Sequence, residues 1–147
     1  SSDVCSSDLA YTDYELRFEK DEAAELCTGV PSTGLIDVIN RSKNPMVGKT
    51  LPLSHELFDF AETIFDVLES RQVTLSKKGE DKGVRLSFEG FPYLIVWSKP
   101  EGDFVAVEPW GGLSTCSDED DVLEHKRGCL VAKPKETVVR SFTIEIL

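Results

Sequence analysis

Glu108 stands where an apolar run ends and a turn begins. The run before it, Val-Ala-Val over residues 105–107, alternates as strands do, and Pro109 fixes the backbone directly after the carboxylate. Trp110 and two glycines follow, which gives an aromatic surface beside a loop that can approach a ligand closely. A carboxylate next to a tryptophan ring suits a sugar, whose C–H face packs on the ring while its hydroxyls bind the carboxylate. A solvated strand end fits the same residues.

The elements that position this carboxylate are predicted to be strands. Alternating or continuously apolar runs, separated by glycine- and proline-containing turns, predict strands over residues 14–20, 35–40, 71–77, 84–90, 91–99, 104–108, 128–131 and 137–147. The sequence Pro-Glu-Gly at residues 100–102 predicts a hairpin between the two strands beside it. At least six strands with little helix indicate an all-β domain, either a sandwich or a barrel.

Residues 53–70 are the segment whose pattern is hardest to assign. Leu57, Ile64 and Leu68 fall at helical spacing, and Ser54 stands where an N-cap is expected. Taken alone, the segment is predicted to be a helix. Its aromatic and β-branched residues would also tolerate an extended path.

The composition is that of one globular domain. The chain has 147 residues, of which 40% are hydrophobic and 29% are charged. Its formal net charge of -11 argues against binding to nucleic acid or to an anionic membrane surface. No apolar run approaches the roughly 18 residues that indicate a transmembrane helix. The four cysteines show neither disulfide nor zinc-ligand spacing, so reduced thiols and a cytoplasmic location are expected.

Residues 1–9 differ from the rest of the chain. The segment is polar and low in complexity, and codons for residues 3–9 can be written as a common sequencing-adapter tail. We therefore expect residues 1–9 to be a non-native or disordered leader. Residues 10–147 are expected to be the C-terminal part of a single β-sandwich domain.

The stretch over residues 91–112, "FPYLIVWSKPEGDFVAVEPWGG", resembles the aldose 1-epimerase or galactose mutarotase family, in particular its bacterial branch. Further matches are "LFDFAETIFDVLESRQVTL" upstream, and "HKRG" and "SFTIEI" downstream. The resemblance implies part of a large antiparallel β-sandwich, incomplete at its N-terminus. It also implies an enzyme that interconverts the α and β anomers of an aldose, a hexose such as galactose or glucose, without a cofactor or metal.

The resemblance assigns roles to single residues. Glu108 matches the family's general base, which accepts the proton of the anomeric hydroxyl. The acid that protonates the ring oxygen is a histidine of the family's N-terminal half, so this chain is expected to lack it and to be inactive alone. Ala61 stands where the family often has a sugar-binding aspartate, with Asp59 and Glu62 beside it. These two acids, together with the tryptophans Trp97 and Trp110, are the expected sugar-binding residues.

Two alternatives stay open. A non-catalytic carbohydrate-binding β-sandwich would use Trp97, Trp110 and Glu108 as a platform for the sugar. A mutarotase acting on hexose 6-phosphates would need a basic pocket, but the four cations between residues 77 and 85 have the spacing of a solvated hairpin. The sequence does not indicate which sugar is used or what the oligomeric state is.

Overall fold

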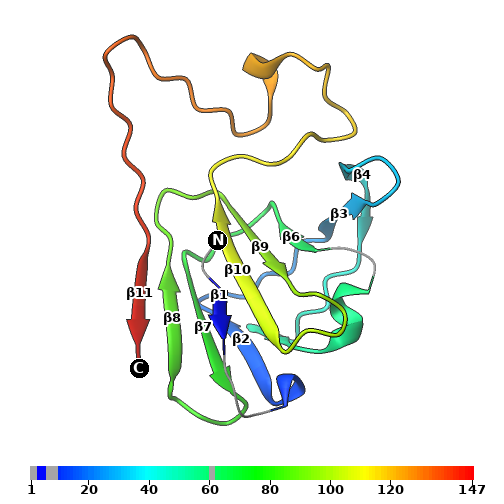
Figure 1. The fold of residues 1–147 in the computed structure, drawn as a ribbon, viewed down its shortest axis with the longest axis vertical. Coiled ribbons are helices and arrows are strands. Elements are labelled where there is room, and N and C mark those ends of the chain that lie inside the picture. Colours follow the sequence, from blue (N-terminus) through cyan, green and yellow to red (C-terminus); the bar gives the residue numbers. More distant parts are fainter. Residues whose placement is uncertain (1–2, 6–9, 60–61) are drawn as a thin grey trace.

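A computed structural model describes residues 3–5, 10–59 and 62–147. Within these residues the chain forms two antiparallel sheets with three short 3₁₀ helices (Figure 1). The prediction of an all-β sandwich is therefore confirmed. No helix in this described part of the chain is long and apolar enough to cross a membrane.

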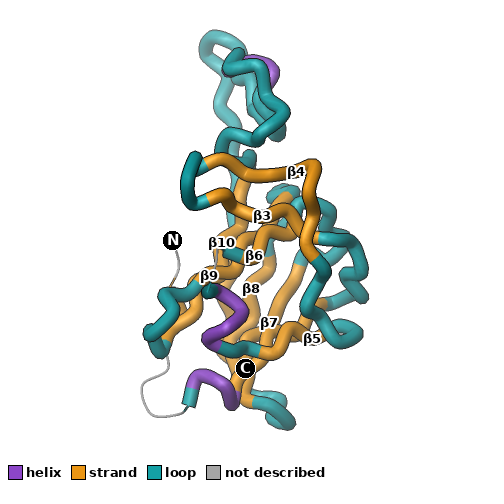
Figure 2. Tube along the Cα trace, turned by 90° about the vertical axis from the view of Figure 1, so that its right-hand side faces the viewer, coloured by secondary structure: helices purple, strands orange, loops and turns teal. Residues whose placement is uncertain are grey.

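The six-stranded sheet, called sheet A here, contains in spatial order β1 (Asp3–Cys5), β10 (Phe104–Trp110), β9 (Tyr93–Trp97), β6 (Thr63–Phe65), β3 (Leu26–Val30) and β4 (Leu35–Ser42). The five-stranded sheet B contains β11 (Thr143–Ile146), β8 (Gly83–Ser87), β7 (Gln72–Lys77), β2 (Tyr14–Phe18) and β5 (Thr50–Pro52). The 3₁₀ helices are η1 (Tyr11–Asp13), η2 (His55–Phe58) and η3 (Leu123–His125). The segment after β10 extends away from the sheets before the chain returns as β11 (Figures 1 and 2).

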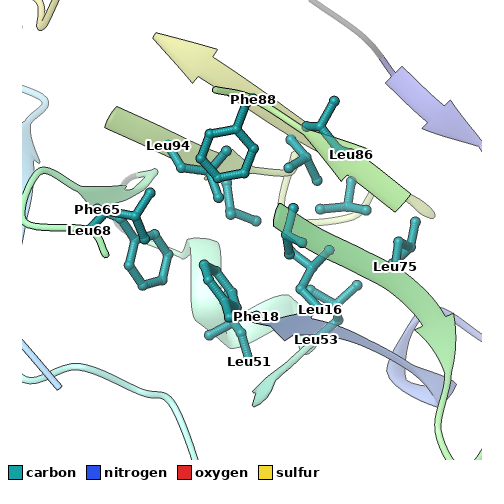
Figure 3. Close-up of a cluster of buried hydrophobic side chains, with 14 of the residues drawn as sticks. Leu16, Phe18, Leu51, Leu53, Phe65, Leu68, Leu75, Leu86, Phe88 and Leu94 are labelled. Carbon is teal, nitrogen blue, oxygen red and sulfur yellow. The ribbon is translucent and has the colours of Figure 1, made fainter. Parts of the chain in front are cut away.

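The main core lies between the two sheets. In β2, Leu16 and Phe18 are buried and alternate with more exposed residues, because successive side chains of a strand point to opposite faces. They meet Phe65 and Leu94 from sheet A, and Phe18 and Phe65 approach with ring centroids 5.0 Å apart (Figure 3). Because one face of sheet A packs in this core, only its opposite, outer face is available for a binding site.

Most strands predicted from clear alternation are confirmed, including the hairpin that β9 and β10 form across residues 98–103. The last strand, predicted over residues 137–147, is confirmed only in part, because β11 covers Thr143–Ile146 and residues 137–142 form no strand. The helix predicted over residues 53–70 is wrong. The described part of that segment forms only the short η2 and the strand β6. All three residues of β6 are buried. A strand that is buried on both faces does not alternate between apolar and polar residues, so the helical spacing of the apolar residues in this segment is a coincidence.

Two further differences concern short strands. β3 lies between the strands predicted over residues 14–20 and 35–40, where no strand is predicted, and a register shift between Leu26 and Thr28 disrupts its alternation. Residues 128–131, predicted as a strand, form none. Leu130 and Val131 are 52% and 71% exposed. The apolar pattern that predicted the strand therefore does not correspond to side chains buried among the described residues.

Part of the predicted leader is described. Residues 3–5 form β1 and pair with Phe104–Ala106 of β10. The remaining leader residues, 1–2 and 6–9, lie outside the described residues. The expectation that the leader is not native stays a prediction.

Candidate functional site

β10 presents two faces with different chemistry. Val105 and Val107 point into the core between the sheets. Glu108 and Trp110 therefore point to the opposite, outer face of sheet A. Trp110 packs there against a second, smaller cluster of buried side chains. Because side chains alternate along β10, the Glu108 carboxylate lies outside the core while Val105 and Val107 anchor the strand in it.

Glu108 and Trp110 bond to each other. The Trp110 indole Nε1–H donates to Glu108 Oε2 at 3.0 Å, and both residues are partly buried. Residues two apart on a strand lie on one face, which is how the sequence sets up this contact. Among the described residues, the second oxygen of the carboxylate has no hydrogen-bond partner. The indole therefore fixes the orientation of the carboxylate while one oxygen remains available.

β9 supplies the next part of the outer face. Ile95 lies directly opposite Glu108, and Trp97 lies opposite Ala106. The Trp97 ring meets Phe104 edge-on, with centroids 5.5 Å apart and an interplanar angle of 61°. Trp97 is 41% exposed, so part of its ring surface is open to a ligand. The structure thus brings Trp97, Glu108 and Trp110 onto one face.

Glu62 joins the same face from the end of β6. Its neighbour Thr63 pairs with Val96, which puts Glu62 across from Trp97. The Glu62 carboxylate lies over Gly29 of β3, where an added Cβ would be 3.0 Å from Oε1. Glycine at that position therefore leaves room for the carboxylate.

Asp59 is not brought to this face by any described contact. It is exposed at the end of η2, and its backbone N–H donates to Glu56 O. Within the described residues, no hydrogen bond or ion pair joins Asp59 to Glu108 or to either tryptophan. Ala61, where the family often has an aspartate, lies outside the described residues.

The segment after β10 covers one end of the face. Leu113 and Cys116 are buried against Ile36 of β4, and Ile36 and Cys116 form a parallel bridge. The Trp110 end of the face is therefore closed, whereas the end with Trp97 and Glu62 stays partly exposed. A ligand bound beside Glu108 would enter from this open end.

An ion pair that the sequence analysis did not identify stands on the same outer face. Arg41 of β4 donates to both oxygens of Asp66, at 2.9 and 2.6 Å, and also to Glu25 O at 2.9 Å. The Asp66 side chain is only 8% exposed. Burial opposes its ionisation, but hydrogen bonds from Arg41 and the Cys27 thiol outweigh burial and lower its pKa. A charged residue inside the apolar run "IFDVL" was the one sequence signal for this pair.

The two histidines stand elsewhere. His55 stacks on Tyr11 with ring centroids 4.8 Å apart, and its Nε2 lies 4.0 Å from Asp103. His125 is exposed in η3, and its Nδ1 lies 2.8 Å from Asp120. Neither histidine bonds to Glu108 within the described chain.

Comparisons with known proteins give two relatives of known sequence. The plasmid and chromosomal forms of Protein LacX from Lactococcus lactis subsp. lactis are each 38% identical over 138 residues, which is 93% of this chain and 46% of LacX. The chain thus spans about half the length of the curated relatives it matches. No protein-family model matches it.

Two solved structures are similar to this chain. A galactose mutarotase related enzyme from Lactobacillus acidophilus superposes with a TM-score of 0.78 at 23% identity, over 95% of this chain and 46% of that one. A galactose mutarotase-like protein from Lactobacillus casei ATCC 334 gives a TM-score of 0.66 at 26% identity, over 90% and 44%. The β-sandwich expected from the resemblance is therefore the fold that the chain has.

Proposed function

We propose that this chain is part of a galactose mutarotase-like enzyme that interconverts the α and β anomers of an aldose, with Glu108 as the general base. The fold that it shares with a galactose mutarotase related enzyme and a galactose mutarotase-like protein supports this proposal. The observation that carries this proposal is the contact of 3.0 Å between the Trp110 indole and Glu108 on the partly open outer face of sheet A. It holds a carboxylate in one orientation beside aromatic surface, as proton transfer from a bound sugar requires.

The reaction needs proton transfer at two oxygens. Glu108 accepts the proton of the anomeric hydroxyl as the ring C1–O bond breaks, and an acid protonates the ring oxygen. The open-chain aldehyde then rotates about C1–C2 and closes on its other face, with the acid and base exchanging roles. No electron is gained or lost, so no redox cofactor enters the balance. The acid is proposed to lie in the part of the domain that this chain does not contain.

Sugar binding is assigned to the open end of the face. Trp97 offers its exposed ring surface to the apolar side of a hexose such as galactose or glucose, and Glu62 across from it accepts hydrogen bonds from hydroxyls. Asp59 remains a weaker candidate, since no described contact connects it to these residues. We place the reaction in the cytoplasm, in keeping with the free thiols of Cys27, Cys116 and Cys129.

A second candidate function is carbohydrate binding without turnover. The Trp97–Phe104 aromatic pair, with Glu62 and Glu108 on the same face, also supports this function, because a platform of this kind needs no acid. The two candidates differ in one observable. Binding alone predicts that sugars associate with the complete protein while the rate of anomer exchange stays that of water.

Sugar binding by this chain can be measured through its own fluorescence, since both of its tryptophans are proposed to contact the sugar. We expect galactose or glucose to change the emission of the wild type and of Trp110→Phe, in which Trp97 is the remaining reporter. The matched pair Glu62→Gln and Glu56→Gln separates a site effect from a general loss of charge, because Glu56 is exposed in η2. Equal affinity of the two variants would remove Glu62 from the site.

Catalysis is tested by polarimetry on the full-length parent and on this chain. In the parent, Glu108→Gln should slow mutarotation by about 10²–10⁴-fold, the usual contribution of a general base. The matched control Glu101→Gln, in the exposed turn of the β9–β10 hairpin, should leave the rate unchanged. This chain alone should not accelerate the reaction. If it does so, and Glu108→Gln abolishes the effect, the claim that its site is incomplete is wrong.

A further inference from the structure

Two carboxylates flank β9 on the outer face of sheet A. Glu62, directly before β6, lies across from Trp97, and in the next row Ile95 lies opposite Glu108. β9 separates β6 from β10 (Figure 1), so Glu62 and Glu108 stand two strand spacings, or about 10 Å, apart across the sheet. A hexose that rests on the Trp97 ring would therefore lie between two carboxylates.

Neither carboxylate has a cationic partner within the described chain. Glu62 is partly buried, and none of the described residues donates a hydrogen bond to it or forms an ion pair with it. Glu108 accepts one hydrogen bond, which comes from the neutral indole of Trp110. A carboxylate that has lost part of its water without gaining a counter-charge is stabilised by a cation. A positively charged group on a ligand would supply that counter-charge.

Cations near this face are already held by carboxylates of their own. The pairs come from β4 and β6 and from the segment after β10, and they are Arg41–Asp66, Lys126–Glu119 and Arg127–Asp118. The hairpin turn beside Trp97 adds the exposed Lys99, but the same turn carries Glu101 and Asp103, so one lysine stands against two acids. The electrostatic field over the proposed sugar site is therefore negative.

Trp97 gives a second, independent reason why a cation fits this site. Its side chain is 41% exposed, and the face of an indole ring attracts a cation more strongly than the face of any other aromatic side chain. Because Glu62 lies across from Trp97 in the register, an ammonium group between them would meet an aromatic face on one side and a carboxylate on the other. A hydroxyl group at the same place would gain only a hydrogen bond.

We infer that the sugar site of this chain selects amino sugars, hexoses that carry an ammonium group, over neutral hexoses and over uronic acids, with Glu62 as the residue that determines this specificity. The inference rests on the proposed function, because it takes the anomeric hydroxyl to lie at Glu108. With C1 of the sugar there, Glu62 on the other side of β9 meets a ring carbon remote from C1, such as C3. A uronic acid would bring a further carboxylate into a negative field and would be repelled.

Titration of the tryptophan fluorescence of this chain tests the selectivity. The ligands are glucose, 3-amino-3-deoxyglucose, its N-acetyl derivative and glucuronate, at about pH 6 and low salt. The amino sugar should bind about fivefold more tightly than glucose, the usual strength of one partly exposed ion pair or cation–π contact. The N-acetyl derivative has no charge and should lose this advantage, and glucuronate should bind most weakly. In 1 M salt the advantage of the amino sugar should shrink, because salt screens exposed charges.

A pair of variants tests the role of Glu62. Glu62→Gln keeps the shape of the side chain and should lose most of the preference for 3-amino-3-deoxyglucose over glucose. The matched control Glu56→Gln, in the exposed η2, should keep the full preference.

The outcomes separate this inference from the proposed function. Equal affinity of the wild type for the two sugars, or a preference that Glu62→Gln leaves unchanged, would overturn the inference and leave the proposed function standing. A clear preference for the amino sugar, together with a full-length parent that does not accelerate mutarotation, would support the inference and refute the proposed catalysis. A chain that binds none of these sugars would refute both, because both need a sugar site on this face.

Discussion

Arg41→Met tests whether the ion pair on the outer face of sheet A holds the edge strand β4 to β6. Arg41 donates two hydrogen bonds to Asp66, whose side chain is 8% exposed, whereas the side chain of Arg41 is 26% exposed. The substitution leaves a carboxylate without its partner and almost without water. Removing one partner of a buried pair costs about 3–5 kcal/mol, and of an exposed pair at most about 1 kcal/mol. The partial exposure of Arg41 places the expected loss near the lower end, at about 3 kcal/mol.

Urea denaturation at pH 7 measures this loss. The comparison needs the wild type, Arg41→Met, Asp66→Asn and the double variant Arg41→Met/Asp66→Leu. Asp66→Asn should cost less than Arg41→Met, because the guanidinium left behind can still reach water. The double variant should recover much of the loss, since no buried charge remains. The reasoning fails if Arg41→Met costs under about 1 kcal/mol, or if the double variant loses the sum of the two single losses.

The same pair predicts the sign of a pH dependence. The pKa of Asp66 is lowered in the folded state, because the hydrogen bonds from Arg41 and Cys27 outweigh burial. The pair therefore stabilises the fold above the ordinary carboxyl pKa of about 3.9, and this contribution is lost as the pH falls further. Without Arg41, burial raises the pKa of Asp66 and the sign reverses. The difference in urea midpoint between wild type and Arg41→Met should thus shrink as the pH is lowered from 7 towards 3.5.

Two further predictions use thiol labelling and a glycine pair. Cys27 is 1% exposed and burial raises its pKa to about 12, so iodoacetamide at pH 8 should label the exposed Cys129 and spare Cys27, as peptide mass mapping would show. In urea denaturation, Gly128→Ala should lower the free energy of unfolding more than Gly34→Ala. Both glycines have positive φ, at 75° and 72°. A Cβ at Gly128 would lie 2.9 Å from Tyr93 Cε2, whereas a Cβ at Gly34 would meet nothing within 4 Å. Equal losses in the free energy of unfolding would show that the close contact with Tyr93 does not destabilise Gly128→Ala.

Whether a strand could be predicted from the sequence depended on whether one or both of its faces are buried. β2 is half buried, so Leu16 and Phe18 alternate with more exposed residues and the strand can be seen in the sequence. β6 is buried on both faces and only three residues long, so its residues carry no period of their own. β3 contains a register shift that depends on its partner β4. Long-range pairing decided these two strands, and single-sequence patterns do not contain it.

The candidate site divides in the same way. Glu108 and Trp110 are two residues apart on one strand, so their shared face follows from local periodicity. Trp97 joins them because a short hairpin fixes the register of β9 against β10. Glu62 reaches the same face only through the pairing of β6 with β9, which joins residues about thirty positions apart. The Arg41–Asp66 pair forms because β4 and β6 lie on either side of β3. No local sequence pattern predicts that arrangement.

The row of residues across sheet A at the level of Glu108 limits where the proposed acid could lie. The register aligns Glu108 with Ile95, then Ile64, then Cys27. The last three are 2%, 0% and 1% exposed and lie in the cluster that the segment after β10 covers. A proton donor for a sugar beside Glu108 therefore has no place on the interior side of that row. Among the described residues, the edge of β10 from Val107 to Trp110 and the open end at Trp97 are the remaining approaches to Glu108.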